Sequence, residues 1–373
     1  MVAVTAVEAC TVRIPLPSPL AFSTRAVVAR DYTLVRVTSD EGVVGIGFNY
    51  AGSSGGELVS AAVRDLLAPV VVGEDPYRVE GLWQEMYQEA LLHGRVGAAV
   101  RALSAVDIAL WDHNARAVGL PLWKLLGGFH SETVPAYASG GYYLDGKTPE
   151  HLADEVRGYV DLGFRAVKIK VGRLEPAGDE ERLAAVRDAV GPDVLVMLDA
   201  NNAWRDLPTA LRAVRRFEPY DPYWIEEPFG PDDIDNHARL ARATPVPVAT
   251  GEIEAGRWRH KELLEKEAAS VLQTDAAVAG GVTEWRRIAA TAASYGVPMA
   301  PHWFHDLHVH LVGATPNSLF VEYFHGSAVL NFRDVIDRHL EIRDGRLVLP
   351  TTPGLGFGWD PDAVARYQVT PWR

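Results

Sequence analysis

Residues 131 to 325 show a repeating pattern in which short β-branched runs alternate with longer amphipathic stretches. The short runs predict strands, and apolar positions at helical spacing between them predict helices. The predicted strands span 134–139, 166–171, 194–199, 223–226, 246–250, 270–273, 298–300 and 319–323. The predicted helices span 151–162, 180–190, 209–216, 237–243, 261–267 and 283–295. Eight strands separated by helices favour a (β/α) barrel over an open sheet.

The first 130 residues carry a different pattern. Two β-type runs, 32–37 and 43–48, are separated by a Ser-Asp-Glu-Gly turn signal. Helical patterns follow at 57–67, 79–92 and 97–118. Strands followed by segregated helices are typical of an α+β domain, so we predict an α+β domain over 1–130 and a barrel over 131–325. Residues 326–373 contain several Gly and Pro, and we expect them to return to the first domain.

Composition limits the kinds of partner. The chain has 373 residues, 48% of them apolar, so it can bury a large core. Its net charge of −13 argues against nucleic acid or an anionic membrane as a partner. The single cysteine, Cys10, excludes an intrachain disulfide and a cysteine-based zinc site. The chain shows neither a signal-peptide pattern nor a membrane-spanning apolar run, so we expect a cytoplasmic protein, with a symmetric homo-oligomer as the ordinary assembly.

Acidic residues follow three consecutive predicted strands. Asp199 ends the third strand, Glu226 ends the fourth, and Glu252 follows the fifth. Because the C-terminal ends of barrel strands converge on one mouth, we expect these carboxylates to lie close together. They cannot all stay ionised there without a cation, and oxygen ligands favour Mg²⁺, with Mn²⁺ as a substitute. The alternative is three separate surface acids near helix N-termini.

Lys168 and Lys170 lie on the second predicted strand, in the sequence Lys-Ile-Lys. Alternate residues of a strand share a face, so both side chains are expected at the barrel mouth. Two adjacent ammonium groups beside a metal favour a neutral amine on one of them, which is what a lysine base needs. The alternative is a pair of lysines on an exposed strand.

An acid–histidine pair is predicted on the other side of the mouth. Asp275 follows the sixth strand and His302 the seventh. A carboxylate beside an imidazole orients it and raises its basicity, as a general acid or base requires. His302 is preferred because it is nearest the strand end, and its rivals are His305, His308 and His310. Glu322, in the eighth strand, either supports a developing enolate or forms a buried salt bridge.

In this order, these residues resemble the enolase superfamily, and within it the mandelate racemase subgroup. Residues 104–128 (SAVDIALWDHNARAVGLPLWKLLGG) are similar to the family's signature helix. The barrel motifs KIK, LDAN, EEP, TGE, QTD and PHW follow in family order, so the resemblance spans nearly the whole chain. It implies that the first domain caps the barrel and sets substrate specificity, and that the barrel is a TIM-like, modified (β/α)7β catalytic domain.

The resemblance also implies a role for each residue. The implied Mg²⁺ ligands are Asp199, Glu226 and Glu252. Lys170 would be the base on one face of the substrate, with Lys168 beside it. His302, paired with Asp275, would act on the opposite face, and Glu322 would support the enolate. Muconate-cycloisomerase-like and dipeptide-epimerase-like members instead place a lysine on the sixth strand, where this chain has Asp275.

These residues permit more than one reaction. A proton α to a carboxylate is very weakly acidic, so its removal requires a Lewis acid that stabilises the enediolate. Loss of a β-hydroxyl then gives dehydration, and dehydration of a sugar acid (aldonate or aldarate) to a 2-keto-3-deoxy acid is the commoner outcome in the resembled subgroup. Reprotonation would instead give a racemase or epimerase of a 2-hydroxy acid or cyclic amino acid derivative. A non-catalytic paralogue that binds small acids is the third interpretation.

Substrate identity is expected to depend on loops of the first domain, since the barrel residues are shared within the family. The two loops concerned are 18–25 and 49–56. Aromatic side chains near the site add apolar surface, which leaves an apolar-substituted acid open as a substrate. The candidate substrate contacts are Arg25, Tyr50, Asn201, Tyr142 and Trp303.

Overall fold

The first part of the chain folds around an antiparallel sheet. The structure, a computed structural model, describes residues 2–373. The sheet has the strand order β13-β1-β2-β3. Its strands are β1 (Val4–Ala21), β2 (Ala26–Ser39), β3 (Val44–Tyr50) and β13 (Gln368–Thr370). The hydrophobic pattern does not predict β1, because Pro15, Pro17 and Pro19 interrupt its second half, where the register with β2 also shifts.

Helix α4 (Ala98–Ala117) packs closely against this sheet. A Cβ atom added to Gly47 of β3 would lie 1.9 Å from the carbonyl oxygen of Ala105, and one added to Gly45 would lie 2.1 Å from that of Ala109. Glycine is therefore required where the strand meets the helix backbone. The other helices of this domain are α1 (Gly56–Ala62), the π-helix η1 (Val63–Leu67), α2 (Ala68–Val71), α3 (Val79–Ala90) and α5 (Leu122–Leu125).

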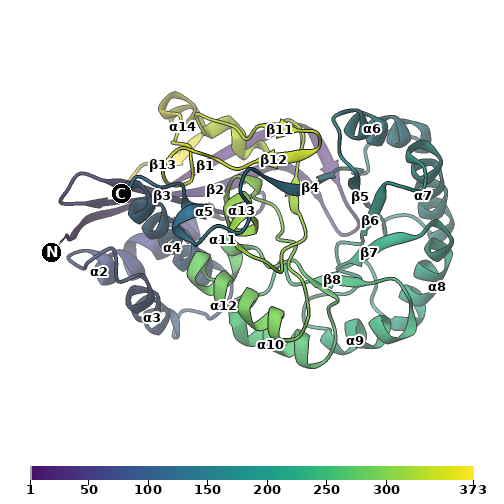
Figure 1. Ribbon diagram of the computed structural model, residues 1–373, viewed down its shortest axis with the longest axis horizontal. Helices are drawn as coiled ribbons and strands as arrows, with labels where there is room; N and C mark the ends of the chain where they lie inside the picture. The colour runs from purple at the N-terminus through teal and green to yellow at the C-terminus, as the bar shows by residue number, and fades with distance from the viewer. Residues whose placement is uncertain (1) are drawn as a thin grey trace.

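The second part of the chain is a barrel of parallel strands (Figure 1). The strands are β4 (Thr133–Ser139), β5 (Ala166–Lys170), β6 (Leu195–Asp199), β7 (Pro222–Glu226), β8 (Val248–Thr250), β9 (Val271–Leu272) and β10 (Val321–Tyr323). β10 pairs with β4, and Met299 forms single bridges to Leu272 and Ser318, which closes the ring. The predicted seventh strand is thus reduced to one bridging residue. The predicted fold class, an α+β domain with a (β/α) barrel, is confirmed.

Helices surround the barrel, and Figure 1 shows α7, α8 and α9 following one another around its outside. They are α6 (Pro149–Asp161), α7 (Pro176–Val190), α8 (Leu207–Phe217), the 3-10 helix η2 (Glu218–Tyr220), α9 (Ile234–Ala243), α10 (Gly256–Glu265), α11 (Ala276–Ala279), α12 (Gly281–Ser294) and α13 (His305–Ala314). The sequence pattern does not predict the short α11 or the almost fully buried α13, because α11 spans only four residues and the polar and apolar residues of α13 do not separate onto two faces. No helix within residues 2–373 is long and apolar enough to cross a membrane.

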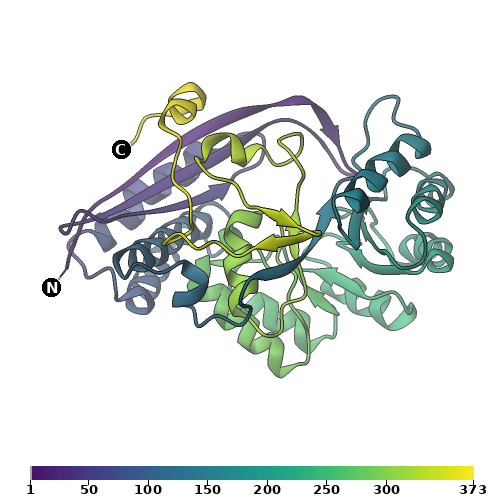
Figure 2. The ribbon, with the colours of Figure 1, turned by 45° about the horizontal axis from the view of Figure 1, so that its top comes forward.

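The C-terminal segment contacts both parts of the molecule (Figure 2). Its elements are the 3-10 helix η3 (Asn331–Val335), β11 (Ile342–Arg343), β12 (Arg346–Val348), α14 (Pro361–Tyr367) and β13. β12 pairs antiparallel with barrel strand β4, whereas β13 pairs with β1 of the first sheet. The chain therefore first adds the β11–β12 hairpin to the barrel, and its final residues then join the first sheet.

Helix α4 also joins the two domains through buried polar contacts. Asp107 accepts hydrogen bonds from the backbone nitrogen of Thr283 at 2.9 Å and from its hydroxyl at 2.6 Å, at the start of α12. The hydroxyl of Ser104 accepts one from the nitrogen of Gly280 at 3.0 Å. The indole nitrogen of Trp83 donates to the carbonyl of Gly280 at 2.7 Å. The capping domain thus supplies partners for the N-terminal amides of a barrel helix.

Candidate active site

The side chains predicted from the strand ends do converge. Lys170, Asp199 and Glu226 are paired across β5, β6 and β7, which brings the ends of three strands level with one another. Lys168 is two residues before Lys170 and points to the same side of β5. Lys168 and the carboxylates of Asp199 and Glu226 are almost fully buried. The strand register alone therefore brings charged groups together inside the barrel mouth.

These groups form a network of ion pairs. The amine of Lys168 lies 2.6 Å from Glu226, 2.8 Å from Glu322 and 3.7 Å from Asp199. The amine of Lys170 lies 2.5 Å from Asp199. Glu322 is thus in the buried salt bridge that was one of its two predicted roles. Each lysine pairs with an acid, but two lysines face three carboxylates, and burial together with the charge of Asp199 raises the pKa of Glu226.

The network holds both lysines in their protonated form. Burial acts to lower the pKa of Lys170, but the neighbouring charge of Asp199 reverses this and holds it above its usual value. Burial likewise opposes the charge on Lys168, yet Glu226 and Glu322 hold its pKa well above the usual range. The attraction of the acids exceeds the repulsion between the lysines here, and a neutral amine beside a bound metal stays a prediction. Burial acts to raise the pKa of Glu322, but Lys168 lowers it to about 2.

Glu252 is the carboxylate that the lysines leave uncompensated. Its Oε2 atom is buried without a hydrogen-bond partner, and its Oε1 atom lies 3.4 Å from Nε2 of His302. Burial, followed by the charges of Glu227 and Glu226, raises the pKa of Glu252 well above its usual value. A buried carboxylate in this position is stabilised by a nearby cation.

The donor set fits a hard divalent cation. Asp199, Glu226 and Glu252 supply only oxygen ligands, which suits Mg²⁺. Within residues 2–373, no three acidic, histidine or cysteine side chains are close enough together to hold one ion as they stand. The reason is geometric, since Lys168 and Lys170 lie directly against Glu226 and Asp199. Binding of an ion would require the lysine amines to move away from these carboxylates.

His302 and Asp275 form the predicted pair. Nδ1 of His302 lies 3.2 Å from Oδ2 of Asp275, whose Oδ1 accepts a hydrogen bond from the backbone of Ala277 at 2.8 Å. Asp275 is therefore held by the start of α11 while it orients the imidazole. The three rival histidines lie in α13 and do not line the pocket, although Nε2 of His308 lies 3.5 Å from Oδ1 of Asp275. Burial lowers the pKa of each of these three: His305, His308 and His310.

The backbone at Trp303 is strained, with a φ of 77°. Its nitrogen donates a 2.8 Å hydrogen bond to Glu322, and its indole stacks on the imidazole of His302 with ring centroids 5.5 Å apart. The guanidinium of Arg30 also lies over this indole, 4.4 Å from its centroid. Strain at this residue is thus compensated by contacts that fix the position of His302.

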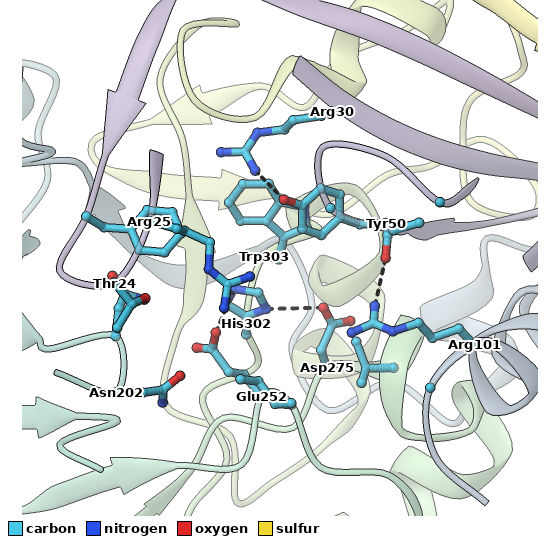
Figure 3. A pocket seen from close by; sticks show the side chains of 18 of the residues that line it. Thr24, Arg25, Arg30, Tyr50, Arg101, Asn202, Glu252, Asp275, His302 and Trp303 are labelled. Carbon is cyan, nitrogen blue, oxygen red and sulfur yellow. Dashed lines mark hydrogen bonds and ion pairs between the residues drawn. The ribbon is translucent and has the colours of Figure 1, made fainter. Parts of the chain in front are cut away.

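A pocket of about 460 Å³ opens above these groups, at the boundary between barrel and capping domain (Figure 3). Lys170, Glu252, Asp275 and His302 line it, whereas Lys168 and the other acids lie beneath its surface. All five candidate substrate contacts also line it: Arg25, Tyr50, Asn201, Tyr142 and Trp303. The amine of Lys170 lies 4.8 Å from the ring centroid of Tyr142.

Sequence reasoning missed other residues that line this pocket: Arg30, Arg101, Asn202 and Glu227. A signal for Arg101 exists, because it shares one face of α4 with Ala105 and Ile108, which are fully buried. A charged side chain at such a position is unusual unless it faces a site. Arg30 gives no comparable signal within β2.

The loop that follows β1 is fastened to the barrel. The hydroxyl of Ser23 donates to the carbonyl oxygens of Ala200 at 2.5 Å and Asn201 at 2.9 Å. Ala21 forms a β-bridge with Tyr143. These contacts hold the turn that carries Arg25 against the ends of the barrel strands.

The fold and the site define a capped (β/α)-barrel protein with acid, lysine and histidine side chains at its strand ends. The chain belongs to the family of mandelate racemase and muconate lactonizing enzymes, in the enolase superfamily. The model of the N-terminal domain of that family matches residues 4–127, and the enolase C-terminal domain-like model matches residues 151–363. The resemblance inferred from the sequence motifs is therefore confirmed.

Individual relatives differ in the reactions that their names describe. The chain is 36% identical to L-talarate/galactarate dehydratase of Salmonella typhimurium, over 90% of this chain and 82% of the relative. It is 37% identical to arabinonate dehydratase of Saccharolobus solfataricus, over 86% of each. A racemase of Streptomyces coelicolor, solved with bound magnesium, superposes with a TM-score of 0.92 at 32% identity, over 98% of this chain and 100% of the other.

Proposed function

We propose that this protein removes the proton α to the carboxylate of a sugar acid, an aldonate or aldarate, in a Mg²⁺-dependent reaction. It then eliminates the β-hydroxyl, giving a 2-keto-3-deoxy acid. The observation that carries the proposal is that Lys170 and His302 line one pocket from different parts of the barrel mouth. Lys170 ends β5, whereas His302 follows the Met299 bridge, and β4 and β10 lie between them in the ring. Two relatives named as sugar-acid dehydratases support this substrate class.

The protein groups have distinct tasks in this reaction. Lys170 accepts the proton from C2, and the electron pair of that bond passes into an enediolate. His302, protonated and oriented by Asp275, donates a proton to the C3 hydroxyl as the C3–O bond breaks. The oxygen leaves as water, and the resulting enol becomes the 2-keto acid. Lys168 keeps Glu322 as its partner, so it stays protonated and supplies positive charge near the substrate carboxylate.

Asp199, Glu226 and Glu252 are the residues that would hold Mg²⁺. The ion, when bound, supplies Lewis-acid stabilisation of the negative charge that develops on the substrate carboxylate. Lys170 would then lose part of the attraction of Asp199 that holds its proton, so its amine would become a better base. We propose Mn²⁺ as a substitute for Mg²⁺ because it accepts the same oxygen ligands.

Racemisation or epimerisation is the second candidate function. Lys170 and His302 could deliver a proton as well as remove one, and a structurally similar protein is named a racemase. In that case a 2-hydroxy acid or a cyclic amino acid derivative would exchange its α-proton without losing water. A non-catalytic paralogue is disfavoured because the residues proposed as base, acid and metal ligands are all present.

The test is a screen of the purified protein with Mg²⁺ in D₂O against aldonates, aldarates, 2-hydroxy acids and proline derivatives. We expect a 2-keto acid from at least one sugar acid, and no product from the Lys170→Ala or His302→Asn variant. Deuterium exchange or inversion without a keto acid would replace dehydration by racemisation. Neither signal with any compound would refute both catalytic proposals for these substrate classes.

We also propose that the protein is cytoplasmic and that it assembles as a symmetric homo-oligomer. Its single cysteine and the ordinary preference of such enzymes for closed symmetric assemblies support this. Light scattering coupled to size-exclusion chromatography tests the assembly, and a monomeric mass would refute it.

A further inference from the structure

The capping domain contributes an arginine to the pocket that no carboxylate neutralises. Arg101 lies near the N-terminus of α4 and lines the pocket together with Asp275 and Val278. Its Nη1 donates a 2.7 Å hydrogen bond to the main-chain oxygen of Tyr50, and among residues 2–373 it forms no ion pair. In Figure 3 its guanidinium points into the pocket beside Asp275. Because a guanidinium carries five N–H donors, most of its donors remain available.

Asp275 is the acid whose charge acts most on Arg101, but both of its carboxylate oxygens already face other partners. Burial lowers the pKa of Arg101, and the charge of Asp275 is the main influence that opposes this shift. Oδ2 of Asp275 faces the imidazole of His302, and its Oδ1 accepts from the backbone of Ala277. A partly buried guanidinium with a single carbonyl partner is poorly compensated and favours an anionic ligand.

The other two arginines of the pocket differ from Arg101. Arg30 is buried, donates to the carbonyl of Val329 at 2.6 Å and to the hydroxyl of Tyr50 at 2.8 Å, and stacks on Trp303. These contacts fix Arg30 against Tyr50 and Trp303 at the side of the pocket. Arg25 is exposed in the turn after β1. Arg101 is thus held in place by a single hydrogen bond and keeps more free donors than Arg30.

We propose that Arg101 binds a second carboxylate of the substrate, so that the preferred substrate is an aldarate rather than an aldonate. This inference rests on the proposed function for the assignment of the first carboxylate to the Lys168 side of the site. The ligand would then have one anionic group at the barrel and another at α4. A pocket of about 460 Å³ is large enough for a sugar diacid. Bidentate pairing of a guanidinium with a carboxylate supplies the discrimination against a terminal hydroxymethyl group.

Binding tests the subsite independently of turnover. In the full-length Lys170→Ala protein with Mg²⁺, calorimetric titration would compare an aldarate with the aldonate of the same chain length and configuration. We expect the aldarate to bind at least about tenfold more tightly. Adding Arg101→Met should remove this preference while leaving aldonate affinity within about threefold, because only the terminal carboxylate contacts Arg101. Arg64→Met, an exposed arginine of the same domain, is the matched control and should keep the preference.

A second variant separates binding from a structural role. Arg101→Lys keeps the charge without the bidentate geometry, so it should retain part of the aldarate preference. Equal loss of affinity for both acids in the Arg101 variants would show a structural role and overturn the proposal. Equal affinity for the two acids in the parent protein, or a preference that survives Arg101→Met, would overturn it as well.

Turnover by the otherwise unmodified protein distinguishes the two proposals. A binding preference lost with Arg101→Met, combined with no keto acid, would refute dehydration but support the subsite. Keto acid formed equally well from both acids would support dehydration and refute the subsite. If neither the aldarate nor the aldonate binds, both proposals are overturned.

Discussion

The pocket has two sides that balance charge in different ways. We define the pocket floor as the buried barrel network of Lys168, Lys170, Asp199, Glu226 and Glu322. We define the pocket wall as the capping-domain side chains Arg25, Arg30, Tyr50 and Arg101. In the floor each lysine amine meets a carboxylate, whereas the wall arginines contact only carbonyl and hydroxyl oxygens or aromatic rings.

Because of this difference, we expect the floor to control the reaction and the wall to control which substrate binds. The floor groups pair with one another and with the proposed metal ion, so we expect their arrangement to depend little on which acid binds. The wall has unmatched positive charge, so its interactions depend on what the ligand offers. We infer that changes in the floor alter turnover of every substrate, while changes in the wall alter which substrate is preferred.

The largest expected effect comes from removing Lys170, the proposed base in the pocket floor. Lys170→Ala should reduce turnover of any accepted acid by about 10³-fold or more, because no other group replaces its amine in proton transfer. Rates of keto acid formation and α-deuterium exchange, with the unfolding temperature as a check on folding, measure this. Lys261→Ala, an exposed lysine of α10, should retain the full rate. Near-normal exchange in Lys170→Ala would assign proton removal to another group.

A second expectation concerns Glu252, the floor's uncompensated neighbour. Glu252→Gln should weaken Mg²⁺ binding by about tenfold to a hundredfold, since one charged ligand is lost. It should also raise the unfolding temperature of the metal-free protein at neutral pH. The reason is that burial and nearby acids raise the pKa of Glu252, so ionising it destabilises the fold.

The sign of the pH dependence follows from that raised pKa. Stability from protonated Glu252 is fully present below the ordinary glutamate pKa and is lost as the pH rises toward the elevated value. Glu252→Gln should therefore flatten the decline in metal-free stability over that range. Thermal melts at several pH values, with and without Mg²⁺, test this, and the exposed Glu265→Gln is the control. Unchanged Mg²⁺ affinity in Glu252→Gln would show that Glu252 is not a metal ligand.

The smallest expected effect on activity comes from the joint between the domains. Asp107→Ala removes the acceptor for both the amide and the hydroxyl of Thr283, so it should lower the free energy of unfolding by about 1–3 kcal/mol. Turnover should change little in the folded fraction. Asp206→Ala is a matched control, because Asp206 bonds the amide and hydroxyl of Thr209 in the same way at an exposed helix start. Urea unfolding should show the smaller loss for Asp206→Ala, and equal losses would mean that burial adds nothing at Asp107.

The floor could be predicted from the sequence because strand register determines it. Lys168, Lys170, Asp199 and Glu226 occupy strand ends whose spacing is one βα unit, so convergence follows from the barrel alone. The protonation state of Lys170 could not be predicted, because it depends on a 2.5 Å contact with Asp199 that no spacing rule specifies. The neutral amine was predicted for a site with a metal beside the lysines, and it stays a prediction.

The wall was harder to predict because it depends on packing between domains. Arg101 reaches the pocket only because α4 is pressed against β3 through Gly45 and Gly47, a contact between residues far apart in the chain. The strand β1 was missed for a related reason. Its prolines obscure the β pattern, and pairing with β2 stabilises it nonetheless.

The C-terminal segment decides how this protein can be recombined with its relatives. Because β12 completes the β4 side of the barrel and β13 extends the β1 edge, neither domain ends where its own sequence block ends. A chimaera that joins residues 1–130 of one protein to a foreign barrel would bring β13 from the wrong parent and leave β1 beside an unmatched strand. Grafts that exchange only the turn at Arg25 or the first turns of α4, with the parental tail kept, preserve both edges. We therefore expect substrate preference to be transferred by exchange of a loop or a side chain, but not by exchange of a whole domain.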